Sequence, residues 1–247
     1  NTTLLSDLVN ITSTSGNDDI DLAGIEGNVI LMLGGGNNTV IVDAVTGDLT
    51  LTTASGNDGV TLTNIAGVTT LDLGDGNNTV SLINTQAGGD VTVTSGSGID
   101  GITLDNVAGQ STDKVTLNLG DGANTAMVTT VNGNLEINGT EGTDTLTLTE
   151  IDGDITINSG NGINTIHLIN TAVQSGNVTI DTGTGDDEIS LTEIVGALVL
   201  RAGSGGNKVT LRNTLVDGAQ RFTGGSVNVT SGTGTDHVTM TNIGDDT

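Results

Sequence analysis

The chain has 247 residues, of which 39 are Gly, one is Phe and none is Trp, Tyr, Pro or Cys. Its 30 acidic and five basic residues give a formal net charge of −25, which excludes nucleic acid and anionic membranes as expected partners. The lack of Cys excludes disulfides and thiolate metal sites, and the near-absence of aromatic residues argues against an irregular globular core. No apolar run reaches the ~20 residues of a membrane-spanning helix, so no membrane insertion is expected.

From its first residues to its last, the chain repeats a unit of about 20 residues. Each of the eleven units contains an Asp or an Asn that follows a Gly by two residues and precedes an aliphatic residue by two. A fixed period of this length is typical of a solenoid, in which copies of one coil stack on each other. We call these eleven residues the Asx row; they are Asp18, Asn38, Asp58, Asn78, Asp100, Asn124, Asp144, Asn164, Asp187, Asn207 and Asp236.

Two short apolar patterns flank each member of the Asx row. Apolar residues lie nine and seven positions before it, as in Val29 and Leu31 before Asn38, and two and four positions after it, as in Val40 and Val42. Alternation with a period of two and enrichment in Val, Ile and Thr predict a half-buried strand on each side. The Gly two residues before the Asx residue is present in all eleven units, so the turn is expected to need a positive φ or close contact between coils.

A third inward position lies seven residues after each Asx residue. It is Ile or Val in all six Asp units and more often Thr or Val in the Asn units. Three inward rows predict an all-β fold, a single-stranded parallel β-helix (β-solenoid), with about 12 coils of roughly 20 residues. At a coil spacing of ~4.8 Å the rod would be about 55 Å long, and the crossover rule favours right-handed winding.

We expect a single β-solenoid domain over residues 1–247, uncapped at both ends, with a longer loop around 214–226. The loop follows from the interval of 29 residues between Asn207 and Asp236, against 20 to 24 elsewhere in the row. Because exposed coil ends pair edge to edge, the chain is expected to self-associate end to end or to continue into further coils.

The strict alternation of Asp and Asn along the Asx row suggests that these side chains have a structural role. Each side chain shares the parity of the inward residues two and four positions later, so it is expected to point inward beside the Gly turn. Adjacent buried carboxylates would repel each other, and an Asn between two Asp doubles the distance between them. One hypothesis is therefore a structural hydrogen-bonded ladder without a metal, in which Asn amides and N–H groups of the glycine turn act as donors.

The turn sequence gives a second hypothesis. Eight stretches, among them residues 34–41 and 183–190, read G-x-G-x-[DN]-x-U-x, where U is apolar. This pattern resembles the haemolysin-type (RTX) nonapeptide G-G-x-G-x-D-x-U-x of secreted bacterial β-roll proteins. The resemblance implies Ca²⁺ held by Asp carboxylates and backbone carbonyls of adjacent turns, although this chain has one motif per coil and a neutral Asn in every second coil. The implied ligands are Asp100, Asp187 and Asp236 and, in turns that lack the first of the two glycines, Asp18, Asp58 and Asp144.

Composition and residue positions also bear on three other classes of protein: enzymes, ice-binding proteins and structural proteins. The five basic residues are scattered, and His167 and His237 lie at outward strand positions, so no enzyme is expected. Outward Thr rows, such as Thr50, Thr70 and Thr92, resemble the ice-binding faces of some β-solenoids. The sequence predicts a non-enzymatic extracellular or cell-surface structural protein of a prokaryote: a rod-like stalk, a filament subunit or a segment of a large surface adhesin. The alternatives are a calcium-responsive binding module and an ice-binding solenoid.

Overall fold

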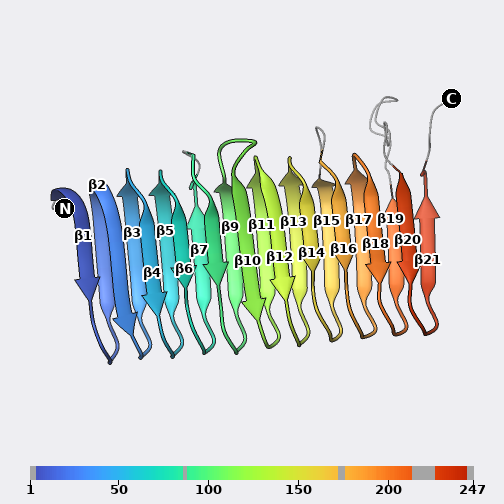
Figure 1. The fold of residues 1–247 in the computed structure, drawn as a ribbon, viewed down its shortest axis with the longest axis horizontal. Helices are drawn as coiled ribbons and strands as arrows, with labels where there is room; N and C mark the ends of the chain where they lie inside the picture. Colours follow the sequence, from blue (N-terminus) through green and yellow to red (C-terminus); the bar gives the residue numbers. More distant parts are fainter. Residues whose placement is uncertain (1–3, 86–87, 172–175, 213–225, 244–247) are drawn as a thin grey trace.

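The computed structural model describes residues 4–85, 88–171, 176–212 and 226–243. Within them the fold is all-β: 21 strands form one parallel β-solenoid of about 10 turns, and no helix is present. Figure 1 shows the strands side by side along the long axis, pointing alternately in opposite directions, with β1 at one end and β21 at the other. The predicted fold class is confirmed.

Each strand pairs in parallel with the strand that has the same place in the next coil, which divides the strands into two faces. Face A contains the strands before the Asx residue and face B those after it, and one long strand passes from face B into face A. Face A consists of β1 (Leu4–Thr12), β2 (Asp19–Gly34), β4 (Leu49–Thr53), β6 (Thr69–Asp72), β8 (Val91–Thr94), β10 (Lys114–Gly120), β12 (Asn134–Gly139), β14 (Ile155–Asn158), β16 (Val178–Asp181), β18 (Leu198–Ala202) and β20 (Val227–Ser231). Face B consists of β2, β3 (Thr39–Val45), β5 (Gly59–Ile65), β7 (Thr79–Ile83), β9 (Gly101–Val107), β11 (Thr125–Val131), β13 (Thr145–Ile151), β15 (Thr165–Thr171), β17 (Glu188–Ile194), β19 (Lys208–Arg212) and β21 (His237–Thr241).

The number of turns differs from the expectation. Since β2 belongs to both faces, each face has eleven strands. Eleven strands are separated by ten intervals, so the solenoid has about 10 turns where the sequence suggested about 12.

The apolar rows predicted from the sequence form the core. Along β4 and β5 the inward residues are buried and the outward ones are more exposed, as the period of two requires. Val40 pairs with Val60 and Val60 with Val80, and all three are at most 2% exposed. The third row is also inward, with Val45 paired to Ile65 and both 1% exposed. Because each core side chain stacks on its equivalent, branched aliphatic residues fill the interior without aromatic ones.

The glycine two residues before the Asx residue is required by its φ in every unit and, in every unit after the first, also by close contact with the preceding coil. All eleven have a positive φ, which is unfavourable for residues with a Cβ atom. At Gly162, with φ 123°, a Cβ atom would lie 1.5 Å from the carbonyl oxygen of Gly142 in the preceding coil. The turns therefore stack so closely that only glycine fits between them.

A second left-handed position occurs six residues after the Asx residue, and the sequence did not lead us to expect it. Gly24 and nine residues with side chains have φ between 53° and 66° there. Asn tolerates this conformation better than most residues, because its short side chain hydrogen-bonds locally. The nine are Ala44, Asn64, Asn84, Asn106, Thr130, Glu150, Asn170, Glu193 and Asn242.

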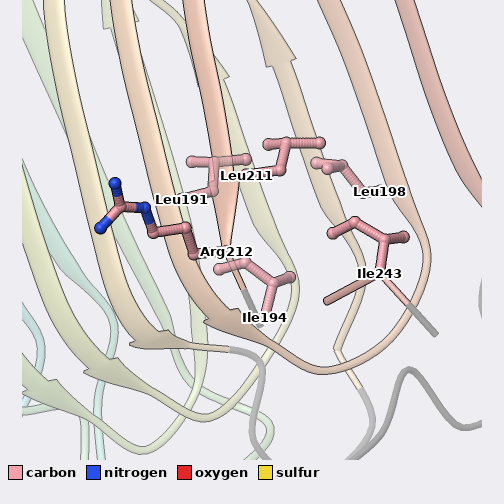
Figure 2. Close-up of a pocket in the computed structure, with 6 residues that line it drawn as sticks. All are labelled: Leu191, Ile194, Leu198, Leu211, Arg212 and Ile243. Atoms are coloured by element: carbon pink, nitrogen blue, oxygen red, sulfur yellow. The ribbon is translucent and has the colours of Figure 1, made fainter. Parts of the chain in front are cut away.

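One pocket lies near the C-terminal end of the solenoid (Figure 2). Five aliphatic residues and Arg212 line it. The third-row position of this unit is Thr214, which lies outside the described residues, as does nearly all of the longer loop expected around 214–226. The lining residues are Leu191, Ile194, Leu198, Leu211, Arg212 and Ile243.

Replacing Ala44 with Gly is expected to stabilise the protein by roughly 0.5–1 kcal/mol. A left-handed conformation costs a residue with a Cβ atom about 1–2 kcal/mol, and the greater flexibility of Gly in the unfolded chain cancels part of the gain. Ala44 is exposed, with φ 59°, so little packing is lost. Urea unfolding of both proteins measures the difference. The control is Ala23→Gly in the extended backbone of β2, which should destabilise the protein; a loss of stability at both positions would contradict the strain argument.

Candidate functional site: the Asx row

The structure brings all eleven members of the Asx row into one line beside the Gly turns. The nine interior members, from Asn38 to Asn207, are at most 2% exposed. Asp18 and Asp236, in the first and last units, are partly exposed because each has a neighbouring coil on one side only. The side chains therefore point inward at the corner between faces A and B.

The row is a continuous hydrogen-bonded ladder. The main-chain N–H of each member donates to the Oδ1 atom of the member in the next coil, from Asp18 through Asp236. Asn38 N–H, for example, lies 2.8 Å from Asp58 Oδ1, and Asp58 N–H lies 3.0 Å from Asn78 Oδ1. The ten donor–acceptor distances are all 2.8–3.1 Å. The sequence pointed to side-chain amides and glycine N–H groups as donors, whereas the N–H groups of the row itself form the ladder.

The second polar atom distinguishes the Asn units from the Asp units. The Nδ2 atoms of Asn38 and Asn78 donate to the carbonyl oxygens of Gly36 and Gly76 in their own turns, both at 3.1 Å. The Oδ2 atoms in four of the six Asp units are buried and have no hydrogen-bond partner, and Asn124 Nδ2 also has none. Each Asp in these four units thus has one satisfied and one unsatisfied oxygen. The four are Asp18, Asp58, Asp100 and Asp187.

The residue five positions before the Asx residue follows the same alternation, which the sequence analysis missed. It is small or hydroxylated in every Asp unit and mostly apolar in the Asn units. Ser95 Oγ donates to the carbonyl oxygen of Leu119 at 2.9 Å, and Thr53 Oγ1 donates to that of Leu73 at 2.7 Å. The Asp-unit residues are Ser13, Thr53, Ser95, Gly139, Thr182 and Ser231, and the Asn-unit residues are Leu33, Leu73, Leu119, Ser159 and Ala202.

Burial changes the acidity of the interior carboxyl groups. Removal from water raises the pKa of Asp100, Asp144 and Asp187, because it disfavours the charged form. Hydrogen bonds from the N–H groups of the preceding Asn residues act against this rise. At the exposed end of the row the balance is reversed, and the N–H of Asn207 holds the pKa of Asp236 below its ordinary value.

Two further ladders lie at the surface, and they run in the opposite direction. In the first, the N–H of Asn37 donates to Asn17 Oδ1 at 2.9 Å, and the N–H of Asn57 donates to Asn37 Oδ1 at 2.8 Å. In the second, ten residues before the Asx row, the N–H of Asp48 donates to Asn28 Oδ1 at 2.9 Å. In both, the later coil donates to the side chain of the earlier one. Their sequence signal is an additional Asp or Asn that recurs in several units.

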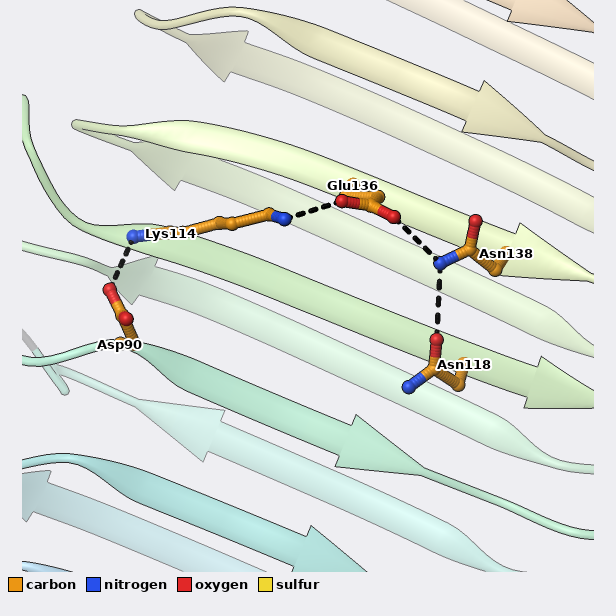
Figure 3. A network of polar contacts seen from close by, with 5 residues as sticks. All are labelled: Asp90, Lys114, Asn118, Glu136 and Asn138. Atoms are coloured by element: carbon orange, nitrogen blue, oxygen red, sulfur yellow. Dashed lines mark hydrogen bonds and ion pairs between the residues drawn. The ribbon is translucent and has the colours of Figure 1, made fainter.

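The charged side chains on face A form a surface network (Figure 3). Lys114 Nζ makes an ion pair with Glu136, and its N–H donates to Asp90 Oδ1 at 2.9 Å. Asn138 Nδ2 donates to Glu136 Oε1 and to Asn118 Oδ1, both at 3.1 Å. The ion pair is solvent-exposed, and exposed pairs contribute only about 0–1 kcal/mol. The network joins coils and has no arrangement of acid, base and nucleophile.

The Asx row was also tested as a Ca²⁺ site. Among the described residues, no three His, Cys, Asp or Glu side chains come close enough together to hold a metal ion. The six Asp are two coils apart from one another, so a cation beside one of them would have a single carboxylate from the row, whereas Ca²⁺ takes 6–8 oxygen ligands. The unpartnered Oδ2 atoms and the turn carbonyls are oxygen ligands of the kind that Ca²⁺ prefers. A cation would, however, receive negative charge from only one carboxylate of the row.

No family model, curated protein or solved structure matches this chain. The resemblance to the haemolysin-type repeat therefore depends on the motif residues alone.

The raised pKa values predict a stability that falls as the pH rises. A carboxyl group whose pKa is higher in the folded than in the unfolded state contributes stability that is fully present below the unfolded pKa, ~3.9 for Asp, and is lost as the pH rises through the folded pKa. Converting Asp100, Asp144 and Asp187 to Asn should remove this loss and raise the stability at pH 7. The expected gain is a few kcal/mol, since Asp100 and Asp187 each have an unpartnered buried acceptor, which costs about 1–3 kcal/mol. Urea unfolding between pH 4 and pH 7 measures the effect.

The matched control converts Asp21, Asp72 and Asp105 to Asn. These residues are exposed on the strands, and the triple variant has the same change in net charge. It should keep the pH dependence that is specific to the interior. Equal flattening in both variants would show that overall charge, and not burial, is the cause.

Proposed function

We propose that the chain is a non-enzymatic structural rod in an extracellular or cell-surface protein of a prokaryote, as a stalk, a filament component or a segment of a large adhesin. The observation that carries this proposal is the repeated cross-section: equivalent residues of successive coils pair in parallel, with register shifts only in β1–β2, β2–β4 and β10–β12 of the described strands, and the core rows are buried in the interior coils. Such a stack gains length without a larger core. No helix in the part of the chain that the structure describes is long and apolar enough to cross a membrane.

The end face of the stack supports continuation. In β21, Val238 and Met240 occupy inward positions but are 43% and 47% exposed. Their equivalents in β19, Val209 and Leu211, are covered by β21 and only 1% and 2% exposed. The same apolar rows would be covered by one more coil, either from further chain or from a second molecule. A rod that continues end to end fits this face.

A calcium-responsive module is the alternative with a specific observation in its favour. The buried Oδ2 atoms without partners, in Asp58, Asp100 and Asp187, would gain a partner from a bound cation. An ice-binding surface has narrower support: Thr50, Thr70, Thr92 and Thr116 stack in register, but Glu136 follows them in the next coil.

Electron microscopy tests the structural role. Negative-stain images of the native material are expected to contain long fibres of uniform width, because each end face continues the same stack. Short discrete particles would favour a binding module. Small-angle scattering of the isolated chain should give a rod, and a compact sphere would contradict the proposal.

Calcium titration separates the structural rod from its alternative. For a metal-free ladder, the thermal unfolding midpoint should be the same in millimolar Ca²⁺ and in chelator. Binding to the folded state would raise the midpoint with calcium concentration. In that case Asp100→Asn should reduce the rise, since it removes one of the candidate ligands, whereas Asp105→Asn, an exposed control in β9, should leave the rise unchanged. A rise that Asp100→Asn reduces and Asp105→Asn does not would replace the metal-free interpretation with a calcium-responsive one.

A further inference from the structure

The steps of the Asx ladder are of two kinds. Where an Asn precedes an Asp, the N–H donates to a carboxylate oxygen. Where an Asp precedes an Asn, the N–H donates to a neutral amide oxygen. Hydrogen bonds to an ionised acceptor are stronger than those between neutral groups.

The side chain of the preceding Asn also acts on the Asp. Asn207 Nδ2 donates to Asp236 Oδ1 at 2.9 Å, in addition to the N–H of the same residue at 3.0 Å. Burial raises the pKa of Asp100, and the N–H and the amide of Asn78 act against that rise. Asp236 thus receives two donors from the Asn before it. An Asp in place of that Asn would bring a carboxylate oxygen to the position of the amide nitrogen.

The basic side chains in the described part of the chain, Lys114, Arg201, Lys208 and Arg212, are all exposed and do not belong to the buried row. The hydroxyls of Ser95 and Thr182 act against the rise in the pKa of Asp100 and Asp187, but a hydroxyl carries no positive charge. In the described part of the chain, Lys114 and Lys208 pair at the surface with Glu136 and Glu188. Two adjacent buried carboxylates would therefore face each other without a cation, which is strongly unfavourable at low dielectric.

We propose that the alternation is a pairing rule: an Asp unit of this solenoid accepts only a unit with a neutral Asx residue as its neighbour, and the coil that stacks on the Asp236 unit is an Asn unit of a parallel β-solenoid. This inference rests on the proposed continuation of the rod. The pairing rule goes beyond that continuation, because it specifies which kind of coil can be added. A second copy that presented its Asp18 unit would place carboxylate against carboxylate, so the rule excludes that direct stacking.

Internal deletions in the full chain test the rule, because coil interfaces inside the rod are the same kind of contact. Deleting residues 59–78 removes one unit and makes Asp58 and Asp100 neighbours. Deleting residues 39–58 also removes 20 residues but makes Asn38 and Asn78 neighbours. Deleting residues 39–78 removes two units and restores the alternation of Asn38 with Asp100. The first two variants have the same number of coils and differ in which members of the Asx row become neighbours. They also differ five residues before the row, where the first keeps Thr53 and the second keeps Leu73, so the point substitution described below isolates the row itself.

The expected result is a lower urea midpoint for the 59–78 deletion than for the 39–58 deletion. The ratio of folded to unfolded protein should differ on the order of tenfold or more, as for a buried polar group without a partner. The 39–78 deletion should unfold cooperatively, with a loss that reflects only its shorter length. Equal midpoints for the two deletions of the same length would overturn the pairing rule.

A point substitution covers the case in which a deletion does not fold. Asn78→Asp places three Asp in adjacent coils and removes the donor to Gly76. Asn57→Asp adds the same charge at an exposed position of a surface ladder and keeps its acceptor oxygen. In chelator, Asn78→Asp should be less stable than Asn57→Asp by a factor on the order of ten in the folding equilibrium. If it is equally or more stable, the rule is wrong, while the proposed rod, which is tested by microscopy, is unaffected.

Discussion

Parallel pairing in register is the constraint on which the rest of the structure depends. It places each residue on the residue that occupies the same position in the next coil, so side chains of the same kind contact each other along the rod. For aliphatic side chains this is favourable, and rows such as Val40, Val60 and Val80 form a core without aromatic residues. For a buried charge it is unfavourable, because like charges would lie one coil apart. The alternation of Asp and Asn lets the same stacking carry acidic residues in its interior.

Much of this architecture follows from the period of the sequence. The two strands of each coil, the third inward row and the inward position of the Asx row result from parity, and side chains of a strand alternate whatever the rest of the fold does. The special role of the glycine before the Asx residue could also be inferred, since an invariant glycine within a repeat indicates a backbone that other residues do not adopt easily. The number of coils was overestimated, because a sequence does not show which partial coils close.

Other features depend on information that a residue pattern does not contain. The left-handed corner at Ala44, Thr130 and Glu150 is imposed by closure of the coil, against the preference of these residues. Main-chain N–H groups form the ladder, and every residue other than Pro has one, so no sequence signal marks them. The alternation at Thr53 and Ser95 was visible in the sequence. A residue pattern alone does not show that these side chains lie next to the Asx row.

The spacing of the contacts has a consequence for how such a chain folds. Paired residues are separated by one unit, as Val40 and Val60 are by 20 residues, wherever they lie in the rod. The entropy lost in closing one coil is therefore nearly the same for each coil, and a longer chain adds steps without adding more distant contacts. Once two coils have formed, every later coil has a finished template, and growth proceeds from either side of that nucleus. A molecule built in this way can become very long before its folding becomes slow.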